Sequence, residues 1–379
     1  MNLYGKFRAL LISSAFGFPI FESLLVSSIT SIHLLLYASL LLICIFMIIR
    51  FGSFKRPTIS NILAIVLVSY LLIIGIIAFV RASLDRSCWS IFLIAFLLLL
   101  SSTVASTDTQ INVNFEGKLF DFWLIFFSAF YILTFIFSKN EIWNTLDSFV
   151  IGRIQPLCIA LIVLGIKVNK MRYFACGTAM WICSFIDYQA SSNFIGILIT
   201  ILILVSIRFK FLSVITLLIA PLLYAVTILN GSFQRIYFWA YNSGYDNSII
   251  RFRLIEEPLQ YLRHSLLFGT SMSKPLHTPD FLVGRDVPFH NDFIALSYAT
   301  GLFGWSLILV LTFNLVMSRA RDILQIEVFS QEKIFAYSLY AAVLYYGIFN
   351  PMFGTFTFIF TYLIIALIPR YQIKEGSKI

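Results

Sequence analysis

Charged residues are scarce in this chain of 379 residues, since Asp, Glu, Lys and Arg together make up only 12%. A typical water-soluble domain carries about 25% charged residues. Hydrophobic residues make up 60% of the chain, and phenylalanine alone occurs 40 times. The composition therefore excludes an ordinary soluble globular protein and predicts that lipid is the solvent for much of the surface.

Cysteine is also rare, with five residues, and no two of them have the close spacing of a zinc site. All five fall inside apolar stretches, and the long polar segment 230–289 contains none. This excludes a disulfide framework or a zinc ribbon in that segment. The segment also lacks the clustered carboxylates that a divalent ion requires, so we expect neither a metal nor a cofactor.

Long apolar runs dominate the sequence. Runs of about 20 residues with almost no charge match the length that an α-helix needs to cross a bilayer. Unbroken Leu, Ile and Phe argue against a β-barrel, whose strands alternate apolar and polar residues. We predict an all-α, polytopic integral membrane protein with about twelve spans. The expected spans are residues 9–29, 31–49, 59–80, 88–105, 119–138, 154–167, 172–187, 192–207, 211–229, 291–317, 334–349 and 353–369.

Basic residues are distributed unequally between the two sets of short connections. Of the 27 lysines and arginines, 17 fall at the termini and in the loops on one side, whereas the other short loops hold only Arg81, Arg86, Lys139 and Arg153. Cytoplasmic loops carry an excess of Lys and Arg, so both termini are expected in the cytoplasm. The net charge of +9 is mostly an orientation signal and implies no nucleic-acid partner.

Only one connection is long enough to build a site. We expect a transmembrane bundle of about nine spans over residues 1–229, a large outer loop over 230–290, and further spans with a cytoplasmic tail over 291–379. The loop is rich in arginine, whose planar fork of donors suits phosphate oxygens. Function is therefore expected to gather in this loop.

An amphipathic helix is predicted within the loop, lying at the membrane surface. Pro258 is expected near its start, because proline is tolerated only in the first turn of a helix. Arg251 falls at the top of the apolar stripe, which favours a bound partner over solvent, although ordinary ion pairs are the alternative for any of these arginines. The polar face contains Arg253, Glu256, Glu257, Gln260, Arg263 and His264, and the apolar face contains Leu254, Ile255, Leu259, Leu262 and Leu266.

A polar triplet, His290, Asn291 and Asp292, directly precedes the apolar run 293–317. Histidine exchanges a proton near neutral pH, so His290 at the outer membrane boundary is a candidate general base acting on a lipid-linked substrate. The alternative is structural, with Asn291 or Asp292 as the N-cap of the helix that follows.

Two short motifs in this region resemble those of the O-antigen polymerase and O-antigen ligase family. His290-Asn291-Asp292-Phe293-Ile294 followed by Gly301-Leu302-Phe303-Gly304 is similar to the family's His-Asn-x-Phe-Leu and Gly-x-x-Gly signature. Arg251 followed by Leu267-Phe268-Gly269 is similar to the element that precedes it. The resemblance covers residues 185–320.

The chain departs from that family at two places. Ser192-Asn193-Phe194 stands where the family has Ser-Arg-Gly, and Leu266 stands where a proline is expected. The missing arginine makes Arg153 and Arg235 candidates for its role.

The resemblance implies a metal-independent glycosyltransferase of the bacterial inner membrane, with a GT-C-like architecture and its active face in the periplasm. The implied substrates are undecaprenyl-pyrophosphate-linked oligosaccharides, and the implied protein partners are a chain-length regulator and a flippase. His290 and Arg251 are the implied catalytic residues. Residues implied to bind the pyrophosphate or the glycan are Arg253, Arg235, Arg153, Asn291 and His264.

Polymerase is favoured over ligase, because departures from the signature are easier to accept in the more divergent polymerases. A ligase would transfer the glycan to the lipid A core instead of to a second repeat unit. A flippase or transporter of lipid-linked oligosaccharides is the alternative from another class. It would be expected to show two related halves and charged helices near the bilayer midplane, whereas the charges here gather at one surface. A membrane scaffold without activity remains the simplest alternative.

Overall fold

The computed structural model describes part of the chain. The described residues are 30–51, 58–81, 88–104, 122, 125–126, 128–133, 136, 154–187, 192–209, 212, 215, 219, 258–274, 277–280, 285–289, 291–325, 331–349, 359 and 361–362. Expected spans 9–29, 211–229 and 353–369 lie wholly or mainly outside them, and half of 119–138 does.

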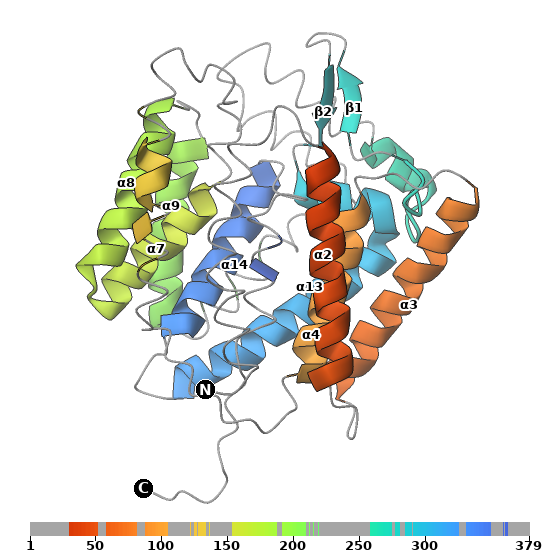
Figure 1. The fold of residues 1–379 in the computed structure, drawn as a ribbon, viewed down its shortest axis with the longest axis horizontal. Helices are drawn as coiled ribbons and strands as arrows, with labels where there is room; N and C mark the ends of the chain where they lie inside the picture. Colours follow the sequence, from red (N-terminus) through yellow and green to blue (C-terminus); the bar gives the residue numbers. More distant parts are fainter. Residues whose placement is uncertain are drawn as a thin grey trace, which may run out of the picture.

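The described elements are α-helices apart from one short hairpin (Figure 1). The helices are α2 (Thr30–Phe51), α3 (Ile59–Val80), α4 (Trp89–Val104), α7 (Gln155–Val168), α8 (Met171–Asp187), α9 (Ser192–Arg208), α13 (Asp292–Gln325) and α14 (Gln331–Phe349). Residues 258–264 are also helical. These bounds follow the expected ranges within a few residues, except that α13 continues beyond residue 317.

Local sequence signals mark several helix ends. The Thr58 hydroxyl caps α3 by accepting a hydrogen bond from the Asn61 backbone N–H at 3.3 Å. Pro156 lies in the first turn of α7, where its missing N–H costs nothing. Helix α7 ends at Asn169, which adopts the left-handed conformation (φ 54°) and allows α8 to begin at once.

The helices form two groups that meet at α13 and α14. Helices α2 and α3 both pack on α4, and α13 packs on α3 and α4. Helices α8, α9 and α14 all pack on α7. The two groups are joined by the contact between α13 and α14 (Figure 1). Most of α7 is buried, so it is the central helix of its group.

Glycines allow α7 and α8 to approach closely. A Cβ atom at Gly165 would lie 2.4 Å from the Phe174 backbone nitrogen, and one at Gly177 would lie 2.9 Å from the Cys158 carbonyl oxygen. Small residues at a helix interface bring backbones together, and this packing is typical of helices that associate in lipid.

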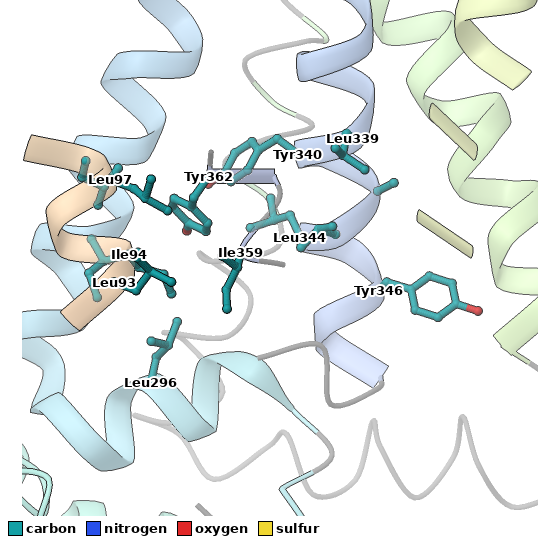
Figure 2. Close-up of a cluster of buried hydrophobic side chains, with 14 of the residues drawn as sticks. Leu93, Ile94, Leu97, Leu296, Leu339, Tyr340, Leu344, Tyr346, Ile359 and Tyr362 are labelled. Atoms are coloured by element: carbon teal, nitrogen blue, oxygen red, sulfur yellow. The ribbon is translucent and has the colours of Figure 1, made fainter. Parts of the chain in front are cut away.

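The core between the two groups consists of aliphatic and tyrosine side chains (Figure 2). The rings of Tyr340 and Tyr362 meet edge to face, with centroids 6.5 Å apart. The residues of this cluster come from α4 (Leu93, Ile94, Leu97), the start of α13 (Leu296), α14 (Leu339, Tyr340, Leu344, Tyr346) and positions Ile359 and Tyr362.

Two described helices are long and apolar enough to cross a membrane, Ile59–Val80 and Asp292–Asn314. Apart from Ser69, the outward face of α3 is apolar from Ile59 (74% exposed) to Val80 (77% exposed). Large exposed apolar side chains also continue along α2 and α9, such as Phe46 and Leu198.

The all-α fold class is confirmed for the described helices, but the sequence analysis did not predict one short hairpin. Strands β1 (His277–Asp280) and β2 (Arg285–Pro288) form an antiparallel hairpin in which His277 pairs with Pro288 and Asp280 pairs with Arg285. The hairpin lies at one end of the bundle (Figure 1). Among the described residues each strand pairs with one other strand only, and an edge position tolerates proline. Strands of four residues are too short to produce a readable alternation.

Candidate functional site

Helix α13 is interrupted at Gly301. This residue has φ 67° and ψ 177°, a conformation that is essentially restricted to glycine. In a continuous helix the N–H groups of Leu302 and Phe303 would donate to the carbonyls of Tyr298 and Ala299. The interruption separates these four backbone groups, and each buried polar group left unsatisfied would cost about 1–3 kcal/mol.

The turn at residues 265–273 hydrogen-bonds all four of these groups. It lies between the short helix 258–264 and the hairpin. Two of its carbonyls accept from the second half of α13, and two of its N–H groups donate to the first half. The hydrogen bonds are Leu302 N to Leu266 O (2.9 Å), Phe303 N to Leu267 O (3.3 Å), Thr270 N to Tyr298 O (2.7 Å) and Met272 N to Ala299 O (3.0 Å). We call this contact the turn–helix junction.

Both glycines of the junction are required by geometry. Gly269 has φ 57°, and a Cβ atom there would lie 2.3 Å from the Tyr298 carbonyl oxygen. A Cβ atom at Gly301 would lie 2.0 Å from the Leu267 carbonyl oxygen. The Leu-Phe-Gly and Gly-Leu-Phe-Gly motifs that carry the family resemblance are therefore in direct contact, each with a glycine where the other approaches.

Tyr70 of α3 is the third component of the junction. Its hydroxyl donates to the Thr300 carbonyl at 2.7 Å, which satisfies the last carbonyl before the interruption. Its ring contacts Phe303 edge to face at 5.0 Å and lies 6.4 Å from the Phe268 ring. Tyr70 therefore links α3 to both motifs.

The short helix 258–264 confirms part of the expected amphipathic pattern. Leu259 (4% exposed) and Leu262 (0% exposed) are buried, whereas Gln260, Arg263 and His264 are exposed. The described helical residues begin at Pro258, consistent with proline in a first turn.

The buried face of this helix packs on protein. The neighbouring Tyr261 ring meets Tyr298 of α13 at 5.4 Å, and Tyr298 also contacts Phe289 at 5.1 Å. The expectation of a helix whose apolar face lies simply on the membrane surface therefore needs correction.

Asn291 is the N-cap of α13, which confirms the structural alternative for this residue. Its Oδ1 accepts a hydrogen bond from the Ile294 backbone N–H at 3.1 Å, and its carbonyl accepts from Ala295 N at 3.0 Å. The side chain is 0% exposed, and its contact with a glycan stays a prediction. Asp292 is the first helical residue and is not the cap.

Of the other predicted site residues, the structure describes only His264. It is exposed on the polar face of the short helix, whereas Asn291 is buried, so the two do not form one surface. The remaining predicted residues, His290, Arg251, Arg253, Arg235 and Arg153, lie outside the described residues. Their roles stay predictions.

The buried carboxylate of Asp292 is a feature that the sequence analysis treated only as a possible cap. It is 4% exposed, and a Cβ atom at Gly347 of α14 would lie 2.4 Å from its Oδ2. Gly347 thus leaves room for the carboxylate between α13 and α14. If this end of α13 lies within a membrane, the carboxylate is a functional candidate by default.

The described residues include segments that follow the predicted catalytic positions in the sequence. His290 directly precedes the cap of α13, and Arg251 precedes the short helix that leads into the junction. Among the described residues no group of three or more His, Cys, Asp or Glu side chains could hold a metal ion.

The first prediction concerns the glycine at the interruption. Gly301→Ala is expected to destabilise the protein by at least about 1–3 kcal/mol, because a side chain is strained at this φ and ψ. The overlap with Leu267 O adds to this cost. Thermal unfolding of the purified protein in detergent measures the effect.

Gly196→Ala in α9 is the matched control for this change. The nearest atom to a Cβ there is 3.6 Å away, an ordinary contact, and alanine in a helix stabilises by up to about 1 kcal/mol relative to glycine. Equal melting temperatures for Gly301→Ala and Gly196→Ala would contradict the junction geometry.

The second prediction concerns the cap of α13. Asn291→Ala is expected to lower the free energy of unfolding by about 1 kcal/mol, because the Ile294 N–H loses its acceptor. Asn291→Ser keeps a capping oxygen and should lose clearly less. Chemical denaturation of both variants tests this, and an equal loss from Ser and Ala would show that capping is not the role of Asn291.

Comparison with known proteins returned no match: no family model, no curated protein and no solved structure resembles this chain. The likeness to O-antigen polymerases therefore rests on the motif residues quoted above, and the activity that it implies stays a prediction.

Proposed function

We propose that this protein is a membrane glycosyltransferase of the O-antigen polymerase class, joining undecaprenyl-pyrophosphate-linked repeat units at the periplasmic face of a bacterial inner membrane. The observation that carries the proposal is the turn–helix junction. The two motifs that resemble the family are separated by about 30 residues, yet the Phe303 N–H of one donates to the Leu267 carbonyl of the other, and three more backbone hydrogen bonds join the residues around them. Contact between them is expected if both serve one site.

A location in the bilayer is supported by the surface of the described helices. Ile73 (58% exposed), Ile76 (60% exposed) and Phe79 (73% exposed) project from α3, a helix long enough to cross the hydrocarbon core. Soluble monomers rarely expose contiguous apolar patches of this kind. Under the proposal, both termini are cytoplasmic and the hairpin side is periplasmic, because basic residues concentrate in the loops of the opposite side.

The proposed reaction is a glycosyl transfer without a metal. A hydroxyl of the acceptor repeat unit forms a bond to the anomeric carbon of the donor glycan while the bond from that carbon to the pyrophosphate oxygen breaks. His290 takes the hydroxyl proton, and undecaprenyl pyrophosphate leaves with the bonding electron pair. Arg251, together with Arg253, Arg235 and Arg153, stabilises the negative charge that develops on the leaving group.

Orientation is tested with single cysteines at Thr278 of the hairpin and Gln325 at the end of α13, in a background that lacks the five native cysteines. An impermeant thiol reagent added to intact cells is expected to label the first position and not the second. Permeabilised cells serve as the control, because both positions should then react. The reverse pattern in intact cells would overturn the orientation.

Activity is tested by supplying purified protein with lipid-linked repeat units and following chain length on gels. Arg251→Lys keeps the charge but removes the planar fork, so chain growth is expected to fall sharply. His290→Ala is expected to slow growth about 100-fold to 10,000-fold, the usual cost of losing a general base. Arg263→Lys, at an exposed position, and His277→Ala, in the hairpin, are the matched controls.

The outcomes of this assay separate the competing functions. Chain growth from repeat units alone supports the polymerase, whereas transfer that requires added lipid A core indicates a ligase. Movement of repeat units across vesicles without any new glycosidic bond indicates a transporter. Wild-type chain growth from both Arg251→Lys and His290→Ala, at equal levels of folded protein, would refute the proposed catalytic residues.

A further inference from the structure

The tip of the turn 265–273 lies level with the middle of α3. The Phe268 ring is 6.4 Å from the ring of Tyr70, and Tyr70 stands midway between the helix ends at Ile59 and Val80. With a rise of 1.5 Å per residue, Tyr70 is about 15 Å from either end of α3. If α3 crosses the hydrocarbon core, which is about 30 Å thick, the tip of the turn is near its centre.

The outward surface of this tip is apolar. Leu267 is 61% exposed and Phe268 is 55% exposed, and Phe303 of α13, whose N–H donates to Leu267 O, is 41% exposed. At the same level of α3, Ile73 is also exposed. The surface of the turn therefore continues the apolar surface of two helices that are each long enough to cross a membrane.

Several backbone groups of the tip find hydrogen-bonding partners within the protein. Irregular backbone is tolerated at membrane depth only where its polar groups find partners within the protein. The carbonyls of Leu266 and Leu267 and the N–H groups of Thr270 and Met272 all bond to α13. Within the turn, Ser265 O accepts from the Gly269 N–H at 2.9 Å.

Charged side chains are confined to the two arms of the segment. Arg263 and His264 are exposed before the tip, and Lys274 is exposed after it. Lys274 lies over the ring of Tyr261 with its Nζ 4.4 Å from the ring centroid, so these two residues join the arms. Long basic side chains reach back to the membrane surface while their stems cover apolar groups.

We propose that residues 258–274 form a re-entrant segment that enters the bilayer core from the hairpin side and returns to the same side. Its partner is the hydrocarbon of the lipid bilayer, which Leu267, Phe268 and Phe303 contact directly. In Figure 1 the segment, coloured teal, lies beside α3 at the hairpin end of the bundle. The inference rests on the bilayer location proposed above but not on glycosyl transfer.

The depth of the tip is measured with an environment-sensitive thiol fluorophore in vesicles of brominated phosphatidylcholine. Three single cysteines are compared in the cysteine-free full chain: Leu267→Cys at the tip, Lys274→Cys on the returning arm, and Ile73→Cys on α3 as the reference for the core. Each protein is reconstituted once with lipid brominated near the headgroup and once with lipid brominated near the end of the acyl chains.

The label at residue 267 is expected to be quenched more by the deeply brominated lipid than by the shallow one. Its emission should also shift to shorter wavelength, and the label at residue 73 should behave in the same way. The label at residue 274 should lose more emission to the shallow lipid. If residue 73 is quenched by the deep lipid but residue 267 only by the shallow one, the segment lies at the surface and the inference is overturned. If the deep lipid quenches neither residue 73 nor residue 267, the proposed bilayer location is wrong. This outcome differs from the one that overturns only the re-entrant segment.

Discussion

Backbone hydrogen bonding at the interruption of α13 is the constraint on which the rest of the described structure depends. Bending the helix at Gly301 frees four backbone groups, and in an apolar interior no water replaces their lost partners. The turn at 265–273 supplies a partner for each group, and Tyr70 supplies one more for Thr300 O. These hydrogen bonds hold the interrupted helix α13, the turn 265–273 and helix α3 together.

This junction determines how the neighbouring elements pack. Beyond the interruption, α13 continues along α3, where Asn314 Nδ2 donates to Ser60 Oγ at 2.6 Å. Before it, the first half of α13 is fully buried, with Leu296 in the core cluster and Asp292 fitted against Gly347 of α14 (Figure 2). The two halves of α13 therefore serve different groups of helices, and the interruption lets one element connect both.

The helices could be predicted from the sequence, because each is a long apolar run whose limits carry local signals such as Thr58 and Pro156. The interruption of α13 could not be predicted from the sequence. Gly301 lies inside an apolar run whose sequence predicts a continuous helix. The backbone groups on either side of it have hydrogen-bonding partners about 30 residues away, a distance over which periodicity carries no information. The same limit applies to Tyr70, whose partner Thr300 is far away in the sequence.

Asn291 shows why the sequence predicts the candidate site only in part. A polar residue at the start of a span fits either a substrate ligand or a helix cap, and composition does not separate the two. The hydrogen bond from the Ile294 N–H identifies Asn291 as the cap, and its contact with a substrate stays a prediction. Residues such as Arg251 and His290 were chosen for the chemistry of their side chains, and they keep that interpretation without a structural test.

The junction also bears on how the proposed chemistry could work in a membrane. Stabilising a leaving pyrophosphate requires donors that are fixed in advance and sheltered from water. A loop at the membrane surface without fixed contacts to the helices would not hold such donors in place. Here the segment that follows Arg251 is anchored to α13 by backbone bonds, and the residue that follows His290 caps the same helix. The described residues that follow Arg251 and His290 in the sequence are therefore held by one helix, although the hairpin separates them along the chain. Under the proposed function, the interruption of α13 and the turn that is hydrogen-bonded to it hold the neighbouring loop residues at the edge of the hydrocarbon. A lipid-linked substrate would present its pyrophosphate there.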